Sequence, residues 1–426
     1  MFQEVKWAVY NILFALAYPF LMPGFILRMC RRGGYAARMN DRFALYPKGF
    51  FGDDFLKSGP VWIHAVSVGE VQVAAQLMRQ WRKVEPGVRF CFSTTSSTGW
   101  KMAEKELRDQ DRLIYNPLDF PNFVKSALKT VRPRAVVLTE SEIWPNFIIT
   151  ARKMSIPLFL INARVSDRSA PRYKAGRFFF KDVFKCFAKI YAQSELDASR
   201  LRAAMESSDA DKVVVTGSFK FDVASRNAAK EQEMRQWVGE GRLLLGGSTW
   251  PGEDEVLLKI YSRLRGKVKL VLAPRHFEKA DAVEDNIKKA GFTCRRRSRG
   301  DTEGEVLLAD TTGELMGLYG VSDVVFVGKS LCAHGSQNMI EPCLCGKVVF
   351  VGPYTENFRP VMSDLLASGA IVQVPDASAL EERIVAAFED DSGEQFKSLV
   401  IRAEEAVLNR RGVVPKCVDD IRGILR

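Results

Sequence analysis

Glu70 stands where a carboxylate can act on a substrate. The apolar segment 61–66 is followed by the turn Ser67-Val68-Gly69 and then by a helical pattern, which places Glu70 at or near a helix start. A glutamate in that position can serve as a general base toward a hydroxyl group. A favourable interaction with the helix dipole is the alternative explanation, because acidic residues are common in a first helical turn.

A second acidic motif follows the apolar segment 135–139. Glu140 and Glu142 are two residues apart at the expected end of a strand, and Pro145 is suited to open the next helix. One of the two carboxylates can bind or orient a polar substrate. Helix capping by Ser141 or Glu142 explains the motif equally well.

Basic side chains follow two further apolar segments of the first half. Arg164 and Arg168 belong to the basic segment 162–174, and the planar guanidinium group suits phosphate oxygens. An anionic, phosphorylated substrate would account for them, whereas a solvated surface loop is the default. The motif 216–222, which contains Lys220, ends the last expected strand of this half, a place from which a residue can reach across a cleft.

The second half of the chain has small and basic residues at its expected strand ends. Ser248 and Thr249 end the motif 246–249, whose backbone amides and hydroxyls suit a phosphate or a sugar. Arg275 can pair with a nucleotide phosphate, and His276 can contact a ligand. Surface ion pairing and capping explain these last two residues as well.

A third motif of this half lies before a helix expected at 339–345. Segments 328–330 and 334–338 precede that helix, whose first amides would bind phosphate, and Glu341 could accept hydrogen bonds from ribose hydroxyls. There is no GxxxxGK[ST] and no GxGxxG sequence. A nucleotide-hydrolysing motor and a dinucleotide dehydrogenase therefore have no direct support.

The elements that position these residues are short apolar runs alternating with helical patterns, such as the helices expected at 71–83, 120–130 and 195–204. This alternation is typical of parallel strands joined by crossover helices, and ligands bind beyond the carboxyl ends of such strands. The expected strands are 61–66, 88–93, 112–115, 135–139, 157–161, 189–192 and 213–216, then 243–247, 268–273, 292–296, 306–309, 324–327, 347–351 and 371–374. Two doubly wound domains facing one cleft are expected, with a hinge in the polar stretch 223–240.

The amino-terminal segment predicts a membrane anchor. Residues 7–27 carry no charge over 21 positions, close to the roughly 20 that a helical crossing needs. The arginines that follow favour a cytoplasmic location for the rest of the chain. Pro19 and Pro23 can instead bend the segment or leave it lying in the membrane interface. A buried amino-terminal helix is the further alternative.

Composition excludes several classes of protein. Of 426 residues, 47% are hydrophobic and 27% charged, which disfavours disorder, collagen-like repeats and a polytopic membrane protein. Eight scattered cysteines without a CxxC pair and only three histidines indicate neither a disulfide framework nor a metal centre, and a reducing compartment is expected. Lys and Arg exceed Asp and Glu by 62 − 51 = 11, which agrees with an anionic membrane surface and equally with RNA. The basic cluster 295–299 is more often a solvated loop than a nucleic-acid site.

Taken together and in this order, eight motifs resemble the 3-deoxy-D-manno-octulosonic acid (Kdo) transferases of lipopolysaccharide synthesis, glycosyltransferase family 30, over nearly the whole chain. The motifs are HAVSVGE (64–70), ESEIWPN (140–146), NARVSDRS (162–169), TGSFKFD (216–222), GST (247–249), APRH (273–276), HGSQNMIEP (334–342) and GPYTENF (352–358).

The resemblance implies an α/β protein of the GT-B type with two Rossmann-like domains. The implied boundaries are an anchor at 1–32, an acceptor-binding domain at 33–225, a linker at 226–240 and a donor-binding domain at 241–426, whose last helix can pack back on the first domain. The implied reaction moves Kdo from CMP-Kdo to the phosphorylated lipid A precursor, with inversion and without a metal or cofactor. The implied location is the cytoplasmic face of the bacterial inner membrane.

The resemblance also implies roles for individual residues. Glu70 would be the catalytic base. The acceptor side would include Ser67, Glu140, Glu142, Arg164 and Arg168. The donor side would include Lys220, Ser248, Thr249, Arg275, His276, Ser336, Gln337, Asn338 and Glu341.

Five positions depart from the family pattern, which commonly has glycine at Lys329, a glycine-histidine pair at 336–337, proline at Met339 and histidine at Tyr354. These departures bear on the contacts to the donor. Two alternative functions stay open at this point. One is a membrane-associated GT-B transferase that uses a UDP-sugar, and the other is a basic, membrane-anchored nucleic-acid-binding protein, although no nucleic-acid partner is expected.

Overall fold

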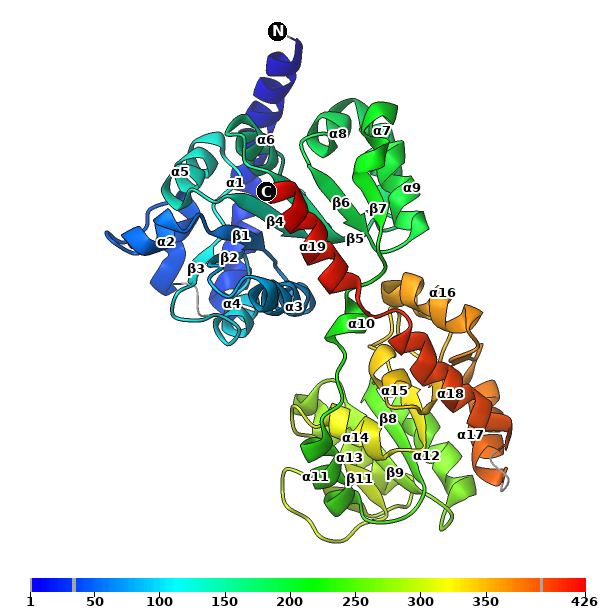
Figure 1. The fold of residues 1–426 in the computed structure, drawn as a ribbon. Coiled ribbons are helices and arrows are strands. Elements are labelled where there is room, and N and C mark those ends of the chain that lie inside the picture. Colours follow the sequence, from blue (N-terminus) through cyan, green and yellow to red (C-terminus); the bar gives the residue numbers. More distant parts are fainter. Residues whose placement is uncertain (1, 33–35, 391–393) are drawn as a thin grey trace. The chain divides into compact units, whose positions relative to one another are not determined.

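The computed structural model describes residues 2–32, 36–390 and 394–426, and the chain divides into two compact units (Figure 1). The first unit comprises Met1–Phe219 together with Gly412–Arg426, and the second comprises Lys220–Arg411. Each unit contains one seven-stranded, wholly parallel sheet. The expected α/β architecture with two parallel sheets is therefore confirmed.

The sheet of the first unit has the strand order β3-β2-β1-β4-β5-β6-β7. This is a doubly wound order, in which the chain moves outward from β1 to one edge and then returns to build the other side. Strands such as Val61–His64 are buried along their whole length because helices cover both faces. The strands are β1 (Val61–His64), β2 (Phe90–Thr94), β3 (Arg112–Tyr115), β4 (Ala135–Thr139), β5 (Leu158–Ala163), β6 (Lys189–Ala192) and β7 (Val213–Val215).

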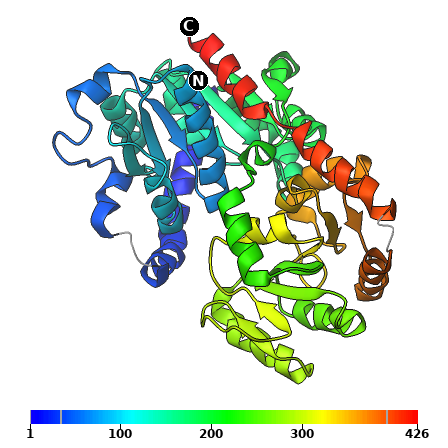
Figure 2. The same cartoon turned by 60° about the horizontal axis from the view of Figure 1, so that its bottom comes forward.

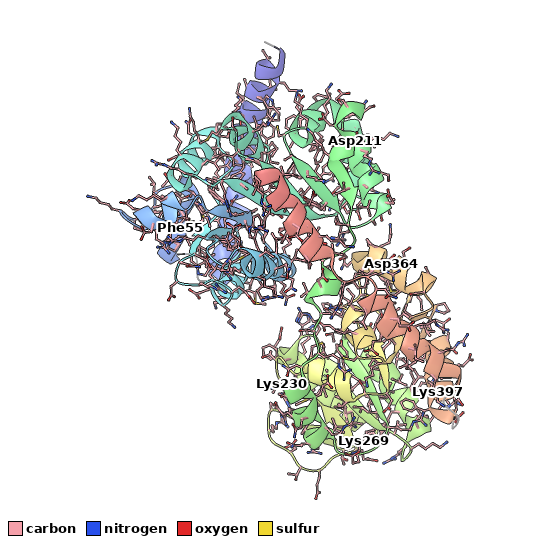
Figure 3. The ribbon with its side chains drawn as sticks, in the orientation of Figure 1. Phe55, Asp211, Lys230, Lys269, Asp364 and Lys397 are labelled. Atoms are coloured by element: carbon pink, nitrogen blue, oxygen red, sulfur yellow. The ribbon has the colours of Figure 1, made fainter. Side chains whose placement is uncertain are left out.

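The helices of the first unit pack on this sheet through apolar faces. Trp62, Trp81 and Phe147 are among its largest fully buried side chains, and Phe55 joins them from a short helix at the edge of the unit (Figure 3). The helices are α1 (Phe2–Arg32), η1 (Ala36–Phe43), α2 (Asp53–Lys57), α3 (Val68–Val84), α4 (Ser97–Glu104), α5 (Pro121–Val131), α6 (Pro145–Lys153), α7 (Ser169–Ala175), α8 (Arg177–Phe184), α9 (Glu195–Ala203), η2 (Ser207–Lys212) and α19 (Val413–Leu425).

The sheet of the second unit has the order β10-β11-β9-β8-β12-β13-β14 and lies between helices (Figure 2). Its strands are β8 (Leu243–Thr249), β9 (Lys269–Pro274), β10 (Cys294–Arg296), β11 (Val306–Leu308), β12 (Val324–Val327), β13 (Val348–Val351) and β14 (Val372–Gln373). Its helices are α10 (Lys220–Val223), α11 (Ala228–Val238), α12 (Glu253–Leu264), η3 (Phe277–Lys279), α13 (Ala280–Lys289), α14 (Leu315–Val321), α15 (Ile340–Leu344), η4 (Glu356–Phe358), α16 (Arg359–Ala367), α17 (Ala377–Glu389) and α18 (Glu394–Leu408).

The membrane-spanning anchor expected at the amino terminus is not supported. Within the described part of the chain, no helix combines the length and the apolarity that a membrane crossing requires. Residues 7–27 lie in helix α1. The boundary expected after residue 32 adjoins residues 33–35, which lie outside the described residues.

One face of α1 packs on the first unit through aromatic side chains. The ring of Trp7 lies 4.7 Å from that of Phe179, and the rings of Phe14 and Tyr18 each lie 5.1 Å from that of Phe120. An ion pair between Lys6 and Asp182 reinforces this contact. The helix is therefore partly covered by protein, as aromatic contacts of this kind stabilise packing.

The unit boundaries differ from the expected domain limits at the linker. Helix α11 occupies most of residues 226–240, and its side chains Met234, Trp237 and Val238 are buried in the core of the second unit. The polar composition of this stretch reflects the exposed face of a packed helix. The change from the first unit to the second falls at Phe219 and Lys220.

Candidate active site

Glu70 is held by hydrogen bonds at the carboxyl end of β1. It occupies the first turn of α3, where the Ser67 hydroxyl caps the helix by accepting from the Glu70 N–H at 3.2 Å. The Glu70 carboxylate in turn accepts from the Ser67 hydroxyl at 2.9 Å and from the Val66 N–H at 2.9 Å. The hydroxyl of Thr139, at the end of β4, donates to the same carboxylate at 3.2 Å. Three donors therefore fix the orientation of this acid.

The acidic neighbours of Glu70 alter its proton affinity. Burial raises the pKa of Glu70, and the negative charges of Glu142 and Glu140 raise it further, against the opposing hydrogen bonds from Val66 and Ser67. A carboxylate with a raised pKa is a stronger base than an ordinary surface glutamate. Glu70 does lie in the first turn of α3, where the helix dipole favours an acid, and the neighbouring Glu142 and Glu140 show that the dipole does not describe its whole environment.

Glu142 is oriented by the indole of Trp144 and lies near the imidazole of His64. Its carboxylate accepts from the Trp144 indole N–H at 2.9 Å, and it lies 3.6 Å from Nε2 of His64, the last residue of β1. His64 is itself buried, and its Nδ1 lies 2.9 Å from the Ser93 hydroxyl oxygen. The acidic motif after β4 and the end of β1 are thus brought into one cluster.

Glu140 has a left-handed backbone conformation, with φ of 49°. Such a conformation is costly for a residue with a Cβ atom and persists where the surroundings fix it. The side-chain amide of Asn162, at the end of β5, donates to the Glu140 carboxylate at 3.2 Å. Asn162 is fully buried and also left-handed, with φ of 51°, and its side-chain oxygen accepts from the Phe219 N–H.

The two arginines expected on the acceptor side lie in different places. The Arg164 N–H donates to the Glu140 carbonyl at 3.4 Å, so Arg164 begins next to the acidic cluster. Arg168 is exposed at the start of α7. No hydrogen bond or ion pair among the described residues joins Arg168 to Glu70, Glu140 or Glu142. The structure therefore brings together Ser67, both acidic motifs and Arg164. Arg168 lies outside this cluster, exposed to solvent.

The expected donor-side residues of the second unit gather at the ends of β8, β9 and β12. Gly328 packs so closely on the end of β8 that a Cβ atom there would lie 2.2 Å from the Ser248 carbonyl oxygen. The Gln337 N–H donates to the Gly328 carbonyl at 3.1 Å, and the Arg275 N–H donates to the Thr249 carbonyl at 3.0 Å. Residues far apart in sequence therefore share one edge of the sheet.

Glu341 and Asn338 form the helix start after β12. The Asn338 side-chain oxygen, just before α15, accepts at 3.1 Å from the N–H of Ile340, the first residue of that helix. Burial raises the pKa of Glu341, and a hydrogen bond from Asn338 opposes this effect. Lys220, from α10, lies over the ring of Phe358 with its Nζ 4.6 Å from the ring centroid. The Glu341 carboxylate, at the start of α15, suits hydrogen bonding to sugar hydroxyls.

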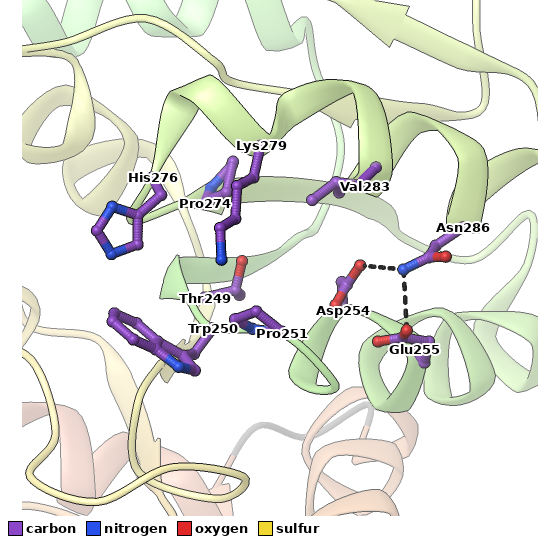
Figure 4. A pocket seen from close by; sticks show the side chains of 11 residues that line it. Thr249, Trp250, Pro251, Asp254, Glu255, Pro274, His276, Lys279, Val283 and Asn286 are labelled. Atoms are coloured by element: carbon purple, nitrogen blue, oxygen red, sulfur yellow. Dashed lines mark hydrogen bonds between the residues drawn. The ribbon is translucent and has the colours of Figure 1, made fainter.

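A pocket of about 80 Å³ lies beside Thr249 and Pro274 (Figure 4). The ring of Trp250 meets that of His276 edge to face at 4.9 Å, while the Asn286 amide bridges Asp254 and Glu255. Arg275 is exposed next to this pocket and forms no ion pair with any described residue. The pocket therefore combines an aromatic wall with both signs of charge.

The five departures from the family pattern also fall in this region. Lys329 and Ser336 have left-handed backbones, with φ of 57° and 59°, a conformation that favours glycine. Met339 is fully buried, and the ring of Tyr354 lies 3.9 Å from that of His334. Gln337 uses its backbone, rather than its side chain, in the contact to Gly328.

Sequence reasoning missed four residues that build these sites. His64, Thr139 and Asn162 are the ends of strands that pair or lie close together in the sheet, a relation that only the strand order reveals. Glu253 lies in the first turn of α12, a position that the helix dipole alone would explain. Its carboxylate is in fact fully buried and bonded to a neighbouring loop. The sequence signal that could have found His64, Thr139 and Asn162 is their position at the ends of expected strands.

The basic cluster at 295–299 is neutralised within the second unit. Arg296 pairs with Asp281, Glu284 and Asp310, and Arg297 pairs with two further glutamates. Paired arginines offer little charge to a polynucleotide backbone. Across the residues that the structure describes, no three His, Cys, Asp or Glu side chains come together as ligands for a metal ion.

The fold is similar to that of several solved structures. A glycosyltransferase from Rickettsia africae superposes with a TM-score of 0.60 at 15% identity over 86% of this chain and 98% of its own. A UDP-GlcNAc 2-epimerase from Neisseria meningitidis gives 0.59 at 14% identity over 86% and 99%. Two Rossmann-like units of this kind define the GT-B architecture.

Sequence comparison identifies the family within that class. Residues 37–223 match the family described as 3-deoxy-D-manno-octulosonic-acid transferase (kdotransferase). A 3-deoxy-D-manno-octulosonic acid transferase of Haemophilus influenzae is 30% identical over 98% of both chains, and that of Bordetella pertussis is 33% identical over 85% of this chain and 88% of its own. The chain belongs to the Kdo transferase family, and it is a glycosyltransferase.

Proposed function

We propose that this protein transfers Kdo from CMP-Kdo to the lipid A precursor, lipid IVA, in lipopolysaccharide synthesis. Family membership supports the sugar that is moved. The observation that carries the mechanism is the environment of Glu70, where three hydrogen-bond donors orient a carboxylate whose pKa is raised by burial and by Glu142 and Glu140. Such a group suits the removal of a proton from a sugar hydroxyl.

In the proposed reaction, the Glu70 carboxylate takes the proton of the acceptor hydroxyl as its oxygen attacks the anomeric carbon of Kdo. The bond from that carbon to the CMP phosphate breaks, the electron pair leaves with CMP, and the anomeric configuration inverts. Negative charge grows on the departing phosphate, so cationic groups that contact it lower the barrier. Arg275 and Lys220 are the proposed cations, and no metal or cofactor takes part.

The remaining site residues bind the two substrates. On the acceptor side, the acidic cluster and Ser67 orient the attacking hydroxyl, and Arg164 and Arg168 receive phosphate groups of the lipid. On the donor side, hydroxyls and amides at the ends of β8 and β12 bind the nucleotide, and Glu341 accepts from its ribose. The donor residues are Ser248, Thr249, His276, Ser336, Gln337, Asn338 and Glu341.

We place the protein on the cytoplasmic face of the bacterial inner membrane, with α1 lying in the interface. One stripe of α1 is apolar and exposed, and Leu13, Leu16 and Phe20 are 60%, 64% and 86% exposed within it. An amphipathic helix that turns such a stripe toward lipid can lie in the plane of the membrane. The excess of 11 basic residues is compatible with anionic lipid and a phosphorylated acceptor.

The test is a transfer assay with purified protein, CMP-Kdo and tetra-acylated lipid A precursor, read by mass spectrometry of the lipid. Wild-type protein should add Kdo and release CMP. We expect Glu70→Gln to lower kcat by about 10² to 10⁴, with unchanged thermal unfolding and CMP-Kdo binding. Glu104→Gln, at an exposed glutamate of the same unit, is the matched control.

Three results would contradict parts of the proposal. A full rate in Glu70→Gln would remove Glu70 from the mechanism. Loss of turnover on adding EDTA would exclude the metal-free reaction. Transfer from a UDP-sugar, with release of UDP in place of CMP, would contradict the donor.

A further inference from the structure

The loop Gly328–Cys332, which follows β12, is held by one buried carboxylate. Glu253 is fully buried at the start of α12, and its side chain accepts five backbone hydrogen bonds. The donors are the N–H groups of Trp250, Lys329, Ser330, Leu331 and Cys332, at 2.8, 2.8, 3.1, 3.0 and 3.4 Å. Successive amides of this kind form an anion-binding nest, which Glu253 itself occupies. The loop is therefore fixed before any ligand binds.

Lys329 has an unfavourable backbone conformation within this loop. Its φ of 57° lies in the left-handed region, where a Cβ atom is strained and glycine is the usual residue. Two bonds hold the conformation, one from the Lys329 N–H to Glu253 and one from the Ser336 N–H to the Lys329 carbonyl at 2.7 Å. A strained residue kept in place by its surroundings is a feature of functional sites. A glycine at position 329 would fit this backbone and would lack only the lysine side chain.

The ammonium group of Lys329 is presented on an aromatic surface. Its Nζ lies 5.0 Å from the ring centroid of Trp250, whose other neighbour is His276. The ring face attracts the cation and restricts the long side chain. Among the described residues, no carboxylate forms an ion pair with Lys329. The ring of Trp250 therefore holds the Lys329 ammonium group in position, and no described carboxylate neutralises its charge.

The position of this cation relates it to the donor. The backbone of Lys329 lies between Gly328, which packs on the Ser248 carbonyl, and Ser336, which bonds to it. Both serines belong to the proposed donor side. We propose that Lys329 is a further donor-binding residue whose ammonium group receives an oxyanion of the sugar nucleotide. This assignment rests on the proposed function, because CMP-Kdo carries two such groups, the phosphodiester and the Kdo carboxylate.

The experiment measures initial rates of transfer against CMP-Kdo concentration. We expect Lys329→Ala to raise the KM for CMP-Kdo about tenfold, as loss of one charge-assisted contact would, and to leave kcat within about twofold. Lys329→Gly also removes the ammonium group and should raise KM to the same extent. Because glycine fits the left-handed backbone, this variant controls for misfolding. Lys329→Arg keeps the charge and should restore most of the affinity. Lys267→Ala, which removes an exposed lysine elsewhere in the same unit, is the matched control.

Inhibition by CMP distinguishes the two oxyanions. If Lys329→Ala weakens CMP inhibition as much as it raises the KM, the partner is the phosphate; if CMP inhibition is unchanged, the partner is the Kdo carboxylate. Both results support the assignment. If the KM is unchanged in both the alanine and the glycine variants, the assignment of Lys329 is wrong, although the proposed Kdo transfer by the wild-type protein is unaffected. Absence of Kdo transfer by the wild-type protein would overturn the proposed function and this assignment together.

Discussion

At the residue scale, the proposed chemistry depends on the protonation state of Glu70. The titratable groups around it are Glu142 and Glu140, with His64 beyond Glu142. A general base acts only when it is deprotonated, so kcat/KM should fall as pH falls through the pKa of Glu70. Because burial and the two acids raise that pKa, the fall should occur at a higher pH than for an ordinary glutamate.

Glu142→Gln tests this dependence. The substitution removes one negative charge, so the pKa of Glu70 should drop and the acid limb of the kcat/KM profile should move to lower pH. The profile is normalised to its own maximum, which separates the shift from any loss of acceptor binding. Glu104→Gln should leave the limb in place. An acid limb that Glu142→Gln does not move would contradict the coupling of the two carboxylates.

Glu253 illustrates why a contact can escape a reading of the sequence. An acid in the first turn of a helix is explained by the helix dipole alone. The structure instead buries this carboxylate among five N–H donors from two loops. Four of those five contacts join Glu253 to residues 76 to 79 positions away, the farthest being Cys332. A long-range bond of this kind has no local pattern in the sequence.

At the element scale, the strands could be predicted well and the partners of the helices could not. Parallel strands buried on both faces are apolar runs bounded by polar residues, so β3, β4, β6 and β12 begin and end where the sequence predicts. The expected site motifs follow these strands for the same reason. Helix α1 differs, because hydropathy measures how apolar a segment is and does not show that Phe120 and Phe179 cover one face of it.

The exposed stripe of α1 gives a prediction for this element. Leu13→Asp with Leu16→Asp should reduce binding of the full chain to vesicles containing phosphatidylglycerol by about tenfold or more, since two leucines lose their contact with lipid. Thermal unfolding should be unchanged, because both side chains are 60% or more exposed. Ile401→Asp with Leu408→Asp, at exposed positions of α18, should bind as the wild type does. Equal binding by both double variants would contradict the interfacial placement of α1.

At the scale of the whole molecule, chain order and structural units do not coincide. Residues Gly412–Arg426 follow the second unit in sequence and belong to the first. Helix α19 packs on α3, and Figures 1 and 2 show it in red. The Tyr191 hydroxyl donates to Asp420 at 2.8 Å, and Arg422 pairs with Glu85. The family resemblance implies that the last helix can pack back on the first domain, and α19 belongs to the first unit.

Two isoleucines of α19 test whether this helix completes the first unit. Ile421 is fully buried against that unit, and Ile424 is 43% exposed on the same helix. We expect Ile421→Ala to lower the free energy of unfolding of the first unit by about 2–5 kcal/mol, because it leaves a cavity. Ile424→Ala should change it by no more than about 0.5 kcal/mol. The measurement is urea unfolding followed by tryptophan fluorescence in a W237F/W250F background, where the remaining tryptophans all lie in the first unit. Equal, small effects of the two substitutions would show that α19 does not contribute to the stability of that unit, because only a docked helix makes Ile421 and Ile424 unequal.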